Sequence, residues 1–277
     1  MVVVKIGDGM GNQLYNYACG YASARRDGDT LMLDISECDN STLRDFELDN
    51  FHIKYDAKES FPNGTLWQKV YKRLRRDIKY HVLKEKSVYA PGKKNHTPAN
   101  VDMRVFKKKR FRNKYLHGYW QNTVYFKEYL DEICGMLTPA YAQSEETKRL
   151  IAEFQTTDTC AVHVRGGDIV GPGRAFFERA LARMRQERPG VRFIVFTNDM
   201  ESAKAALPKE GISYIADMGA FSDVDEFFLM VACRNQIISN STYSTWAAYL
   251  NPNEEKVVIM PEHELGEYLR LPGWIVL

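Results

Sequence analysis

The sequence lacks the features that mark several broad classes of protein. Its longest apolar runs are too short to cross a bilayer, and the apolar start at residues 1–6 is broken by Gly7 and Asp8, too early for a signal peptide. Its 38 basic and 36 acidic residues leave a net charge of +2, so the whole chain is not a nucleic-acid polycation. It contains no internal repeat and no low-complexity segment. A globular protein without a membrane span is therefore expected.

Cysteine is scarce and is not patterned for disulfides or metals. The count is odd and no pair has C-x-x-C spacing; the five are Cys19, Cys38, Cys134, Cys160 and Cys233. This usage is typical of free thiols in a reducing compartment. We therefore expect a cytoplasmic protein, and no group of residues has the spacing of a metal site.

The beginning of the chain has the pattern of a strand, a glycine loop and a helix. Residues 2–6 are a β-branched run, and Gly7, Gly9 and Gly11 follow it. Apolar residues at helical spacing then predict a helix over 12–26, and a second strand is expected at 30–35, ending near Asp34.

The second half alternates regularly between strand and helix patterns. Strands are expected at 159–165, 191–197, 213–216, 236–239 and 257–260, and helices at 145–154, 175–187, 201–207, 223–234, 242–250 and 262–271. Such alternation predicts a parallel sheet covered on both faces. We predict an α/β protein of two domains, 1–140 and 141–277, with the ligand in a cleft between them.

Polar side chains follow three of these predicted strands. His163 and Arg165 share one face of the strand at 159–165, and two glycines and Asp168 come next. A structural ion pair at a strand end is the alternative reading of this pattern.

The other two strand ends carry Asn198 with Asp199, and Ser241 with Thr242. Each pair taken alone is explained by turn or capping chemistry, as is Asp225 at the start of a helix. Because the carboxyl ends of parallel strands meet at one edge, the three pairs converge on one crevice. The start of the helix at 242–250 could bind a phosphate there.

Four stretches, taken in chain order, resemble the α-1,2-fucosyltransferase family of inverting glycosyltransferases. They are residues 9–14 with Tyr17 and Ala18, residues 118–121, His163 to Asp168, and Asp225 to Trp246 with residues 237–244 among them. The resemblance implies a GT-B-like fold of two Rossmann-type domains, with GDP-fucose held mainly by the second domain and the acceptor sugar by the first. It also implies transfer to the 2-hydroxyl of a terminal galactose, with inversion and without a metal or other cofactor.

The resemblance and the strand ends together give a set of candidate site residues. The expected catalytic residues are Arg165, Asp168 and Asn12. The expected donor contacts are Gly11, Asn12, His163, Arg165, Asn198, Asp199, Asp225, Asn240, Ser241, Thr242 and Ser244. The expected acceptor contacts are Tyr119, Trp120 and Gln121, with core packing as the alternative for the two aromatic residues. Asp168 is the first candidate for the general base, and Asp8 and Asp34 are alternatives.

The chain departs from the family pattern beside Arg165. The family's second arginine is Gly166 here, which removes one diphosphate contact and raises the alternative of a non-catalytic nucleotide-sugar or glycan-binding protein. A further rival is an NAD-dependent oxidoreductase, but Asn12 stands where the dinucleotide fingerprint has its third glycine.

Two basic stretches suggest a further partner. Residues 69–86 and 107–114 are rich in lysine and arginine, which suits peripheral contact with an anionic membrane, with a solvated face as the alternative. The chain lacks the membrane anchor of Golgi fucosyltransferases, so a bacterial-type enzyme is expected. Nothing in the pattern specifies nucleic acid.

Overall fold

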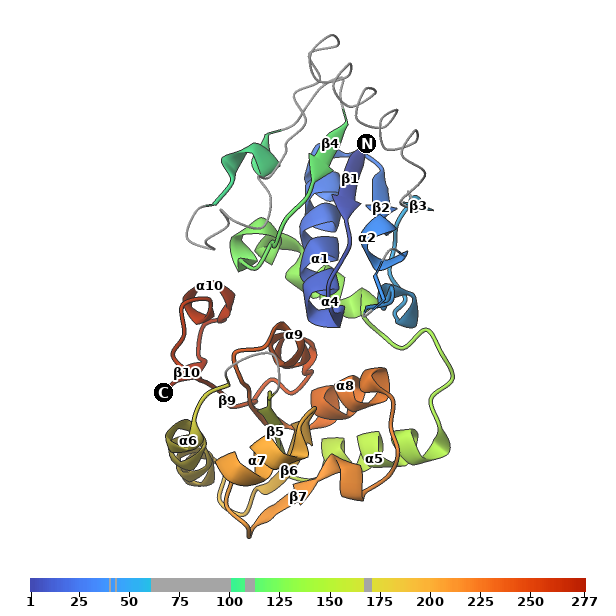
Figure 1. Ribbon diagram of the computed structural model, residues 1–277. Helices are drawn as coiled ribbons and strands as arrows, with labels where there is room; N and C mark the ends of the chain where they lie inside the picture. Colours follow the sequence, from blue (N-terminus) through green and yellow to red (C-terminus); the bar gives the residue numbers. More distant parts are fainter. Residues whose placement is uncertain (40, 43, 61–100, 108–112, 167–170) are drawn as a thin grey trace. The chain divides into compact units, whose positions relative to one another are not determined.

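The protein is built from two compact units, Met1–Ala140 and Tyr141–Leu277 (Figure 1). The structure is a computed structural model that describes residues 1–39, 41–42, 44–60, 101–107, 113–166 and 171–277. Each unit contains a parallel β-sheet covered by helices. The predicted α/β class is therefore confirmed.

The first unit has a four-stranded sheet in the order β3-β2-β1-β4, all parallel. Its elements are β1 (Val2–Lys5), α1 (Met10–Asp27), β2 (Leu31–Asp34), α2 (Ser36–Asp39), η1 (Leu48–Asn50), β3 (Ala57–Glu59), η2 (Met103–Phe106), β4 (Lys114–Leu116), η3 (Thr123–Tyr125), η4 (Lys127–Tyr129) and α4 (Leu130–Met136).

The long helix α1 packs directly on β1 at one glycine and ends at another. A Cβ at Gly20 would lie 2.6 Å from Cγ1 of Val4, so only glycine permits this close approach. Gly28 ends α1 in the left-handed conformation, with φ of 61°, and its N–H bonds to the last turn. The carboxyl ends of β1 and β2 lie side by side, because Lys5 is paired with Asp34. The loop after β1 leads from this edge into the amino end of α1.

The second unit has a six-stranded parallel sheet in the order β10-β9-β8-β5-β6-β7. Its elements are α5 (Glu145–Thr156), β5 (Thr159–Val164), α6 (Arg174–Glu187), β6 (Arg192–Thr197), α7 (Met200–Ala206), β7 (Ile212–Tyr214), η5 (Ile215–Asp217), α8 (Asp223–Ala232), β8 (Asn235–Ile237), α9 (Thr242–Leu250), β9 (Val258–Met260), α10 (Gly266–Leu269) and β10 (Ile275–Val276).

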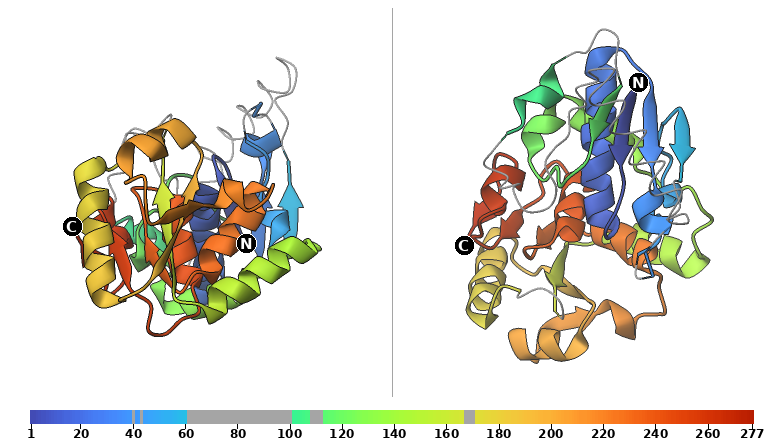
Figure 2. Two further views of the ribbon diagram at one scale, coloured as in Figure 1. Left: turned by 90° about the horizontal axis from the view of Figure 1, so that it is seen from below. Right: turned by 45° about the horizontal axis from the view of Figure 1, so that its top comes forward.

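Side-chain alternation along β5 decides which helices cover each face of this sheet. Cys160, Val162 and Val164 join a buried cluster with the apolar residues of α6 and α7. His163, between them in sequence, faces the other side, where its ring contacts Tyr243 of α9. Figures 1 and 2 show α6 and α5 on opposite sides of the sheet of this unit.

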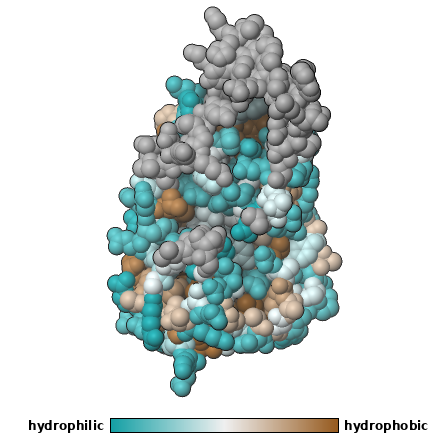
Figure 3. All heavy atoms as spheres, in the orientation of Figure 1, coloured by the Kyte–Doolittle hydropathy of each residue, from teal (hydrophilic) through white to brown (hydrophobic). Residues whose placement is uncertain are grey.

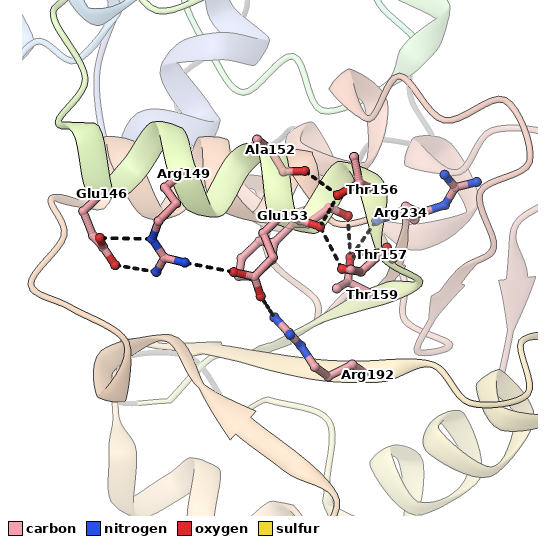
Figure 4. A network of polar contacts seen from close by, with 10 residues as sticks. Glu146, Arg149, Ala152, Glu153, Thr156, Thr157, Thr159, Arg192 and Arg234 are labelled. Carbon is pink, nitrogen blue, oxygen red and sulfur yellow. Dashed lines mark hydrogen bonds and ion pairs between the residues drawn. The ribbon is translucent and has the colours of Figure 1, made fainter.

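A surface network ties α5 to β6. Arg149 bonds to Glu146 and Glu153 on its own helix, and Glu153 accepts a 2.7 Å bond from Arg192 at the start of β6 (Figure 4). These side chains are partly exposed, so each ion pair contributes about 0–1 kcal/mol. The network orients α5 rather than holding the unit together.

The described surface is largely hydrophilic. On the face drawn in Figure 3, apolar residues are scattered among polar ones. Of the large apolar side chains in the described ranges, Met103 is the one that is exposed, at 62%. Within the same ranges, no helix combines the length and the apolar character that a bilayer span requires.

The predictions from the sequence were incomplete for three short strands and wrong at the end of the chain. β3, β4 and β10 were not expected, and the helix predicted at 262–271 is only α10 (Gly266–Leu269), followed by β10. The basic stretch 107–114 was also misread at Lys114, which is buried in β4 and paired with Asp27. The basic stretch at 69–86 lies outside the described residues, as do residues 108–112 of the other stretch.

Candidate functional site

The carboxyl ends of β8, β5 and β6 are neighbours in the sheet of the second unit. β5 pairs with β8 on one side and with β6 on the other. The sequence motifs that follow these three strands are therefore brought to one edge, as the sequence predicted. They contain His163 near the end of β5 and Arg165 just after it, Asn198 and Asp199 after β6, and residues 239–242 after β8.

His163 is a buried, neutral imidazole at this edge. Its side chain is 5% exposed, and Nδ1 lies 2.8 Å from Oγ of Ser239, beyond the end of β8. Burial, and secondarily the positive charge of Arg165, lower the pKa of His163 to about 3. At neutral pH the ring therefore offers hydrogen bonds and packing rather than charge, while Arg165 carries the positive charge.

Aromatic contacts hold the His163 ring in place. The ring of Tyr243, in the first turn of α9, lies 5.7 Å from that of His163 and 5.2 Å from that of Phe227 on α8. The hydroxyl of Tyr243 donates a 2.7 Å bond to the carbonyl of Asp223. This stack fixes the start of α9 beside the end of β5.

The amino end of α9 is built differently from those of α7 and α8. Asp199 caps α7 and Ser222 caps α8 through their side chains. Ser241 is the N-cap of α9, but its side chain makes no capping bond, and the first turn of α9 contains no acidic residue. The Ser241 side chain and an acidic residue therefore do not compete for this helix start, whose dipole favours an anion.

Asn198 fastens the turn that follows Arg165. Its Oδ1 accepts a bond from the N–H of Gly166 and its Nδ2 donates to the carbonyl of Gly166, both at 3.1 Å. A Cβ at Gly166 would lie 2.8 Å from Cβ of Asp199 and 2.9 Å from Cβ of Ser202. The space of a larger side chain at position 166 is therefore filled by the start of α7.

Three other predicted donor contacts have partners within the second unit. Asp199 accepts bonds from the N–H groups of Glu201 and Ser202. Asp225 accepts from the hydroxyls of Tyr141 and Ser222, at 2.8 and 2.7 Å. Ser244 is fully buried and donates to the carbonyl of Ser241. Asn240 and Thr242 are half-buried at the start of α9.

In the first unit, a hydrogen bond joins two predicted site residues. Nε2 of Gln121, beyond the end of β4, donates to Oδ1 of Asn12 in the first turn of α1, at 2.8 Å. Gly11 is buried beside Asn12, and Tyr119 is half-buried. The first and second sequence motifs therefore meet at the carboxyl edge of this sheet, since β1 pairs with β4.

Trp120 does not have the position that a sugar contact needs. Its side chain is 0% exposed, and its ring packs edge-on against Tyr125, with centroids 5.2 Å apart. The prediction that Trp120 stacks on a sugar is therefore corrected in favour of core packing, because a closed core offers no free ring face.

The candidate bases differ in what the structure shows. Asp168, the first candidate, lies in 167–170, outside the described residues. Oδ1 of Asp34 accepts bonds from the N–H and the hydroxyl of Ser36, at the turn into α2. Asp8 has φ of 63°, which is rare for a residue other than glycine and costs backbone energy.

Over the described ranges, no three His, Cys, Asp or Glu side chains group as a metal site.

Sequence reasoning missed several residues that shape these edges. Ser239 and Tyr243 hold the His163 ring, yet a serine at a strand end and a tyrosine in a first turn are ordinary residues. Gln13 is fully buried, and its side-chain amide makes three hydrogen bonds to backbone groups. These belong to Asp8 in the glycine loop and to Asp45 and Glu47. The available signal for Gln13 was a polar side chain near the start of the predicted helix, since such a side chain needs hydrogen-bond partners where it is buried.

Comparisons with known proteins were consistent with this architecture. The family described as "Glycosyl transferase family 11" matches residues 93–276, well over half of the chain. The O-antigen biosynthesis glycosyltransferase WbnK of Escherichia coli is 27% identical, covering 98% of this chain and 99% of the relative. The α-1,2-colitosyltransferase of Escherichia coli is 28% identical, covering 94% and 91% respectively.

A solved structure shares the fold at low identity. The NodZ α-1,6-fucosyltransferase co-crystallized with GDP, a protein from Bradyrhizobium, aligns with a TM-score of 0.51 and 17% identity. The alignment covers 91% of this chain and 92% of NodZ. With the two parallel-sheet units described above, this likeness confirms the predicted GT-B-like fold.

Proposed function

The chain belongs to glycosyl transferase family 11, and we propose that it transfers L-fucose from GDP-β-L-fucose to the 2-hydroxyl of a terminal galactose. The observation that carries the proposal is the shared carboxyl edge of the paired strands β5 and β8: Arg165 follows the first strand, and a helix start with no side-chain cap follows the second. These are groups suited to a nucleoside diphosphate. The match to a glycosyltransferase family argues against the alternative of an NAD-dependent oxidoreductase.

The donor half of the proposal rests on the second unit. Arg165 supplies a fixed positive charge, and the N–H groups at the start of α9 supply oriented donors. The ring of His163 is held by Ser239 and Tyr243. Because the lowered pKa keeps this ring neutral, it does not repel Arg165. Together these groups would stabilise the charge that develops on departing GDP.

The acceptor half rests on the first unit. The Asn12–Gln121 pair presents amide groups at the carboxyl edge of its sheet. Amides both donate and accept, which suits the hydroxyls of a sugar. Asn12 is assigned as the group that orients the acceptor, and Tyr119 and Gln121 as further acceptor contacts. One relative is named for O-antigen biosynthesis, so a galactose-ended polysaccharide precursor is the proposed acceptor class.

The proposed reaction is a single displacement with inversion. The 2-oxygen of galactose attacks C1 of fucose, the bond from C1 to the β-phosphate oxygen breaks, and GDP leaves with the electron pair. The attacking hydroxyl loses its proton to a base, for which Asp168 is the first candidate and Asp8 and Asp34 are alternatives. The charge on GDP is met by Arg165 and α9, so the proposal includes no metal and no cofactor.

Colitosyl transfer is a second candidate for the donor sugar. The relative named α-1,2-colitosyltransferase is 28% identical to this chain over almost its whole length. Colitose is fucose without its 3-hydroxyl, so one nucleotide site serves both donors and only a sugar contact distinguishes them.

One assay tests the proposal and its alternatives. The protein is incubated with GDP-fucose or GDP-colitose and a panel of β-galactosides, with and without excess EDTA, and the linkage of each product is determined by NMR. We expect an α-1,2-fucosyl galactoside, formed at nearly the same rate with EDTA. A colitosyl product alone identifies the second candidate. GDP-fucose binding without any product identifies a non-catalytic binding protein.

A further inference from the structure

Asn16, in the second turn of α1, has an unsatisfied hydrogen-bond acceptor. The residue is 6% exposed, and its Oδ1 is buried without a hydrogen-bond partner among the described residues. Leaving a buried amide oxygen unpaired costs free energy, so a native structure that keeps one calls for an explanation.

The neighbouring Gln13 shows how α1 treats an amide with a purely structural role. Gln13 is 0% exposed, and both ends of its amide are used. Nε2 donates to the carbonyls of Asp8 and Asp45, and Oε1 accepts from the N–H of Glu47. Asn16 is nearly as buried, yet its oxygen is not used in this way.

The position of Asn16 relates it to the proposed acceptor groups. Asn12 and Asn16 are four residues apart on α1, so they lie on one face of the helix, and helical side chains tilt toward the amino end. Asn12 is bonded to Gln121 at that end. The helix starts at Gly9, which has no side chain to cap it, and its first turn contains no acidic residue. The unpaired Asn16 oxygen therefore belongs to the same face of α1 as the Asn12–Gln121 pair.

The chemistry of the unpaired atom selects the ligand. An amide Oδ1 only accepts hydrogen bonds, so its partner must donate. The oxygens of an ionised diphosphate cannot donate, whereas a sugar hydroxyl donates one bond and accepts others. We propose that Asn16 is a further acceptor-binding residue, whose Oδ1 takes a hydrogen bond from a non-reacting hydroxyl of the acceptor sugar. This inference rests on the proposed function.

The test compares an apolar variant with a matched control. Asn16→Leu keeps the approximate size and removes the polar group, so thermal stability should be retained or increased. The acceptor KM should rise about tenfold, while the GDP-fucose KM stays within about twofold of wild type. The control is Asn251→Leu in the second unit, where a 3% exposed amide bonds to the carbonyl of Cys233 and the N–H of Asn253. It should lose stability and keep its acceptor KM.

Deoxygenated acceptors identify the hydroxyl and do not depend on how the apolar variant folds. With the wild-type protein, one of the 3-, 4- or 6-deoxy galactosides should show an acceptor KM about tenfold higher. Asn16→Asp, which keeps an accepting oxygen, should retain the discrimination against that analogue, and Asn16→Ser, whose hydroxyl is shorter, should lose it. Asn16→Leu, where it folds, should also be indifferent to the analogue.

The outcomes separate this inference from the proposed function. If no galactoside is fucosylated, the proposed function fails. If galactosides are fucosylated but Asn16→Leu and Asn16→Ser keep the wild-type acceptor KM, Asn16 has no acceptor role and a water molecule is the partner of its oxygen. Equal discrimination among the deoxy acceptors in wild type and Asn16→Ser would overturn the inference in the same way.

Discussion

Asn198 should support Arg165 through the two hydrogen bonds that it makes with Gly166. Both bonds are 3.1 Å long, and the backbone groups involved are partly buried. At about 1 kcal/mol for each bond, Asn198→Ala should lower the free energy of unfolding by about 2 kcal/mol. For a chain of this size, the melting temperature should fall by about 4–8 °C.

The same variant should also slow transfer, because the turn at Gly166 directly follows Arg165. Loosening this turn spreads the guanidinium over more positions, and small displacements of a catalytic group are expensive. We expect kcat/KM for GDP-fucose to fall about tenfold or more. Asn198→Asp should behave similarly, since its second oxygen would face the carbonyl of Gly166 instead of donating to it.

A matched control separates stability from function. Asn253 also makes two backbone bonds, from Nδ2 to the carbonyl of Arg234 and from the N–H of Glu255 to Oδ1. It precedes β9 and so lies at the opposite, amino edge of the sheet. Asn253→Ala should be destabilised to a similar extent but remain active, by thermal melting and steady-state kinetics. An Asn198→Ala protein that loses stability and keeps wild-type kcat/KM would refute the positioning role. A rise in donor KM without loss of stability would instead indicate a direct donor contact.

Three further predictions address the core, the pH dependence and the base. Lys114→Met should lower the free energy of unfolding by about 3–5 kcal/mol in chemical denaturation, because it leaves the carboxylate of Asp27 buried without its 2.7 Å partner. Lys148→Met breaks only an exposed ion pair, so it should change the free energy of unfolding by less than about 1 kcal/mol. Burial, and secondarily the charge of Asp223, raise the pKa of Glu226 from 4.5 to about 7; the protonated form is thus favoured in the folded state, and stability is lost as pH rises from 4.5 through 7. Glu226→Gln should therefore gain melting temperature relative to wild type at pH 8 but not at pH 4, and an equal difference at both would contradict the shift. If Asp168 is the base, Asp168→Asn should lower kcat by roughly 10²–10⁴ with GDP-fucose binding retained in calorimetry, whereas near-normal turnover would move the role to Asp8 or Asp34.

The sequence predicted the long elements because their local signals are strong. α5 and α8 begin where serines at 144 and 222 cap them, and the expected helix at 242–250 is observed with the same bounds. β5 and β6 were expected within one residue at each end, since buried parallel strands are continuous apolar runs.

The short elements carried too little signal. β3 and β4 have three residues each and β10 has two, so alternation could not be recognised. β7, β8 and β9 are as short, but they were expected because they belong to the regular succession of strand and helix patterns. Lys114 shows the same limit, because its neutralising partner, Asp27, is 87 positions away in the sequence and no local pattern reveals that they meet.

At the site, strand position could be predicted from the sequence, but the hydrogen-bond partners of each residue could not. The convergence of the motifs on β8, β5 and β6 follows from the parallel sheet alone. That both amide groups of Asn198 bond to Gly166, or that Trp120 is closed inside the core, depends on tertiary packing that one sequence does not encode locally.

The central claim, that Arg165 holds the diphosphate of GDP-fucose and its developing charge, is tested most directly by steady-state kinetics on Arg165→Ala and Arg165→Lys, with circular dichroism to confirm folding. Arg165 follows β5, which pairs with β8; α9 begins after β8 without a side-chain cap, and Gly166 adds no second charge. Arg165→Ala should lose about 3 kcal/mol or more of transition-state stabilisation, or about a hundredfold in kcat/KM. Arg165→Lys should recover only part, since an ammonium lacks the bidentate fork. A folded Arg165→Ala protein with wild-type turnover and donor affinity would contradict the account.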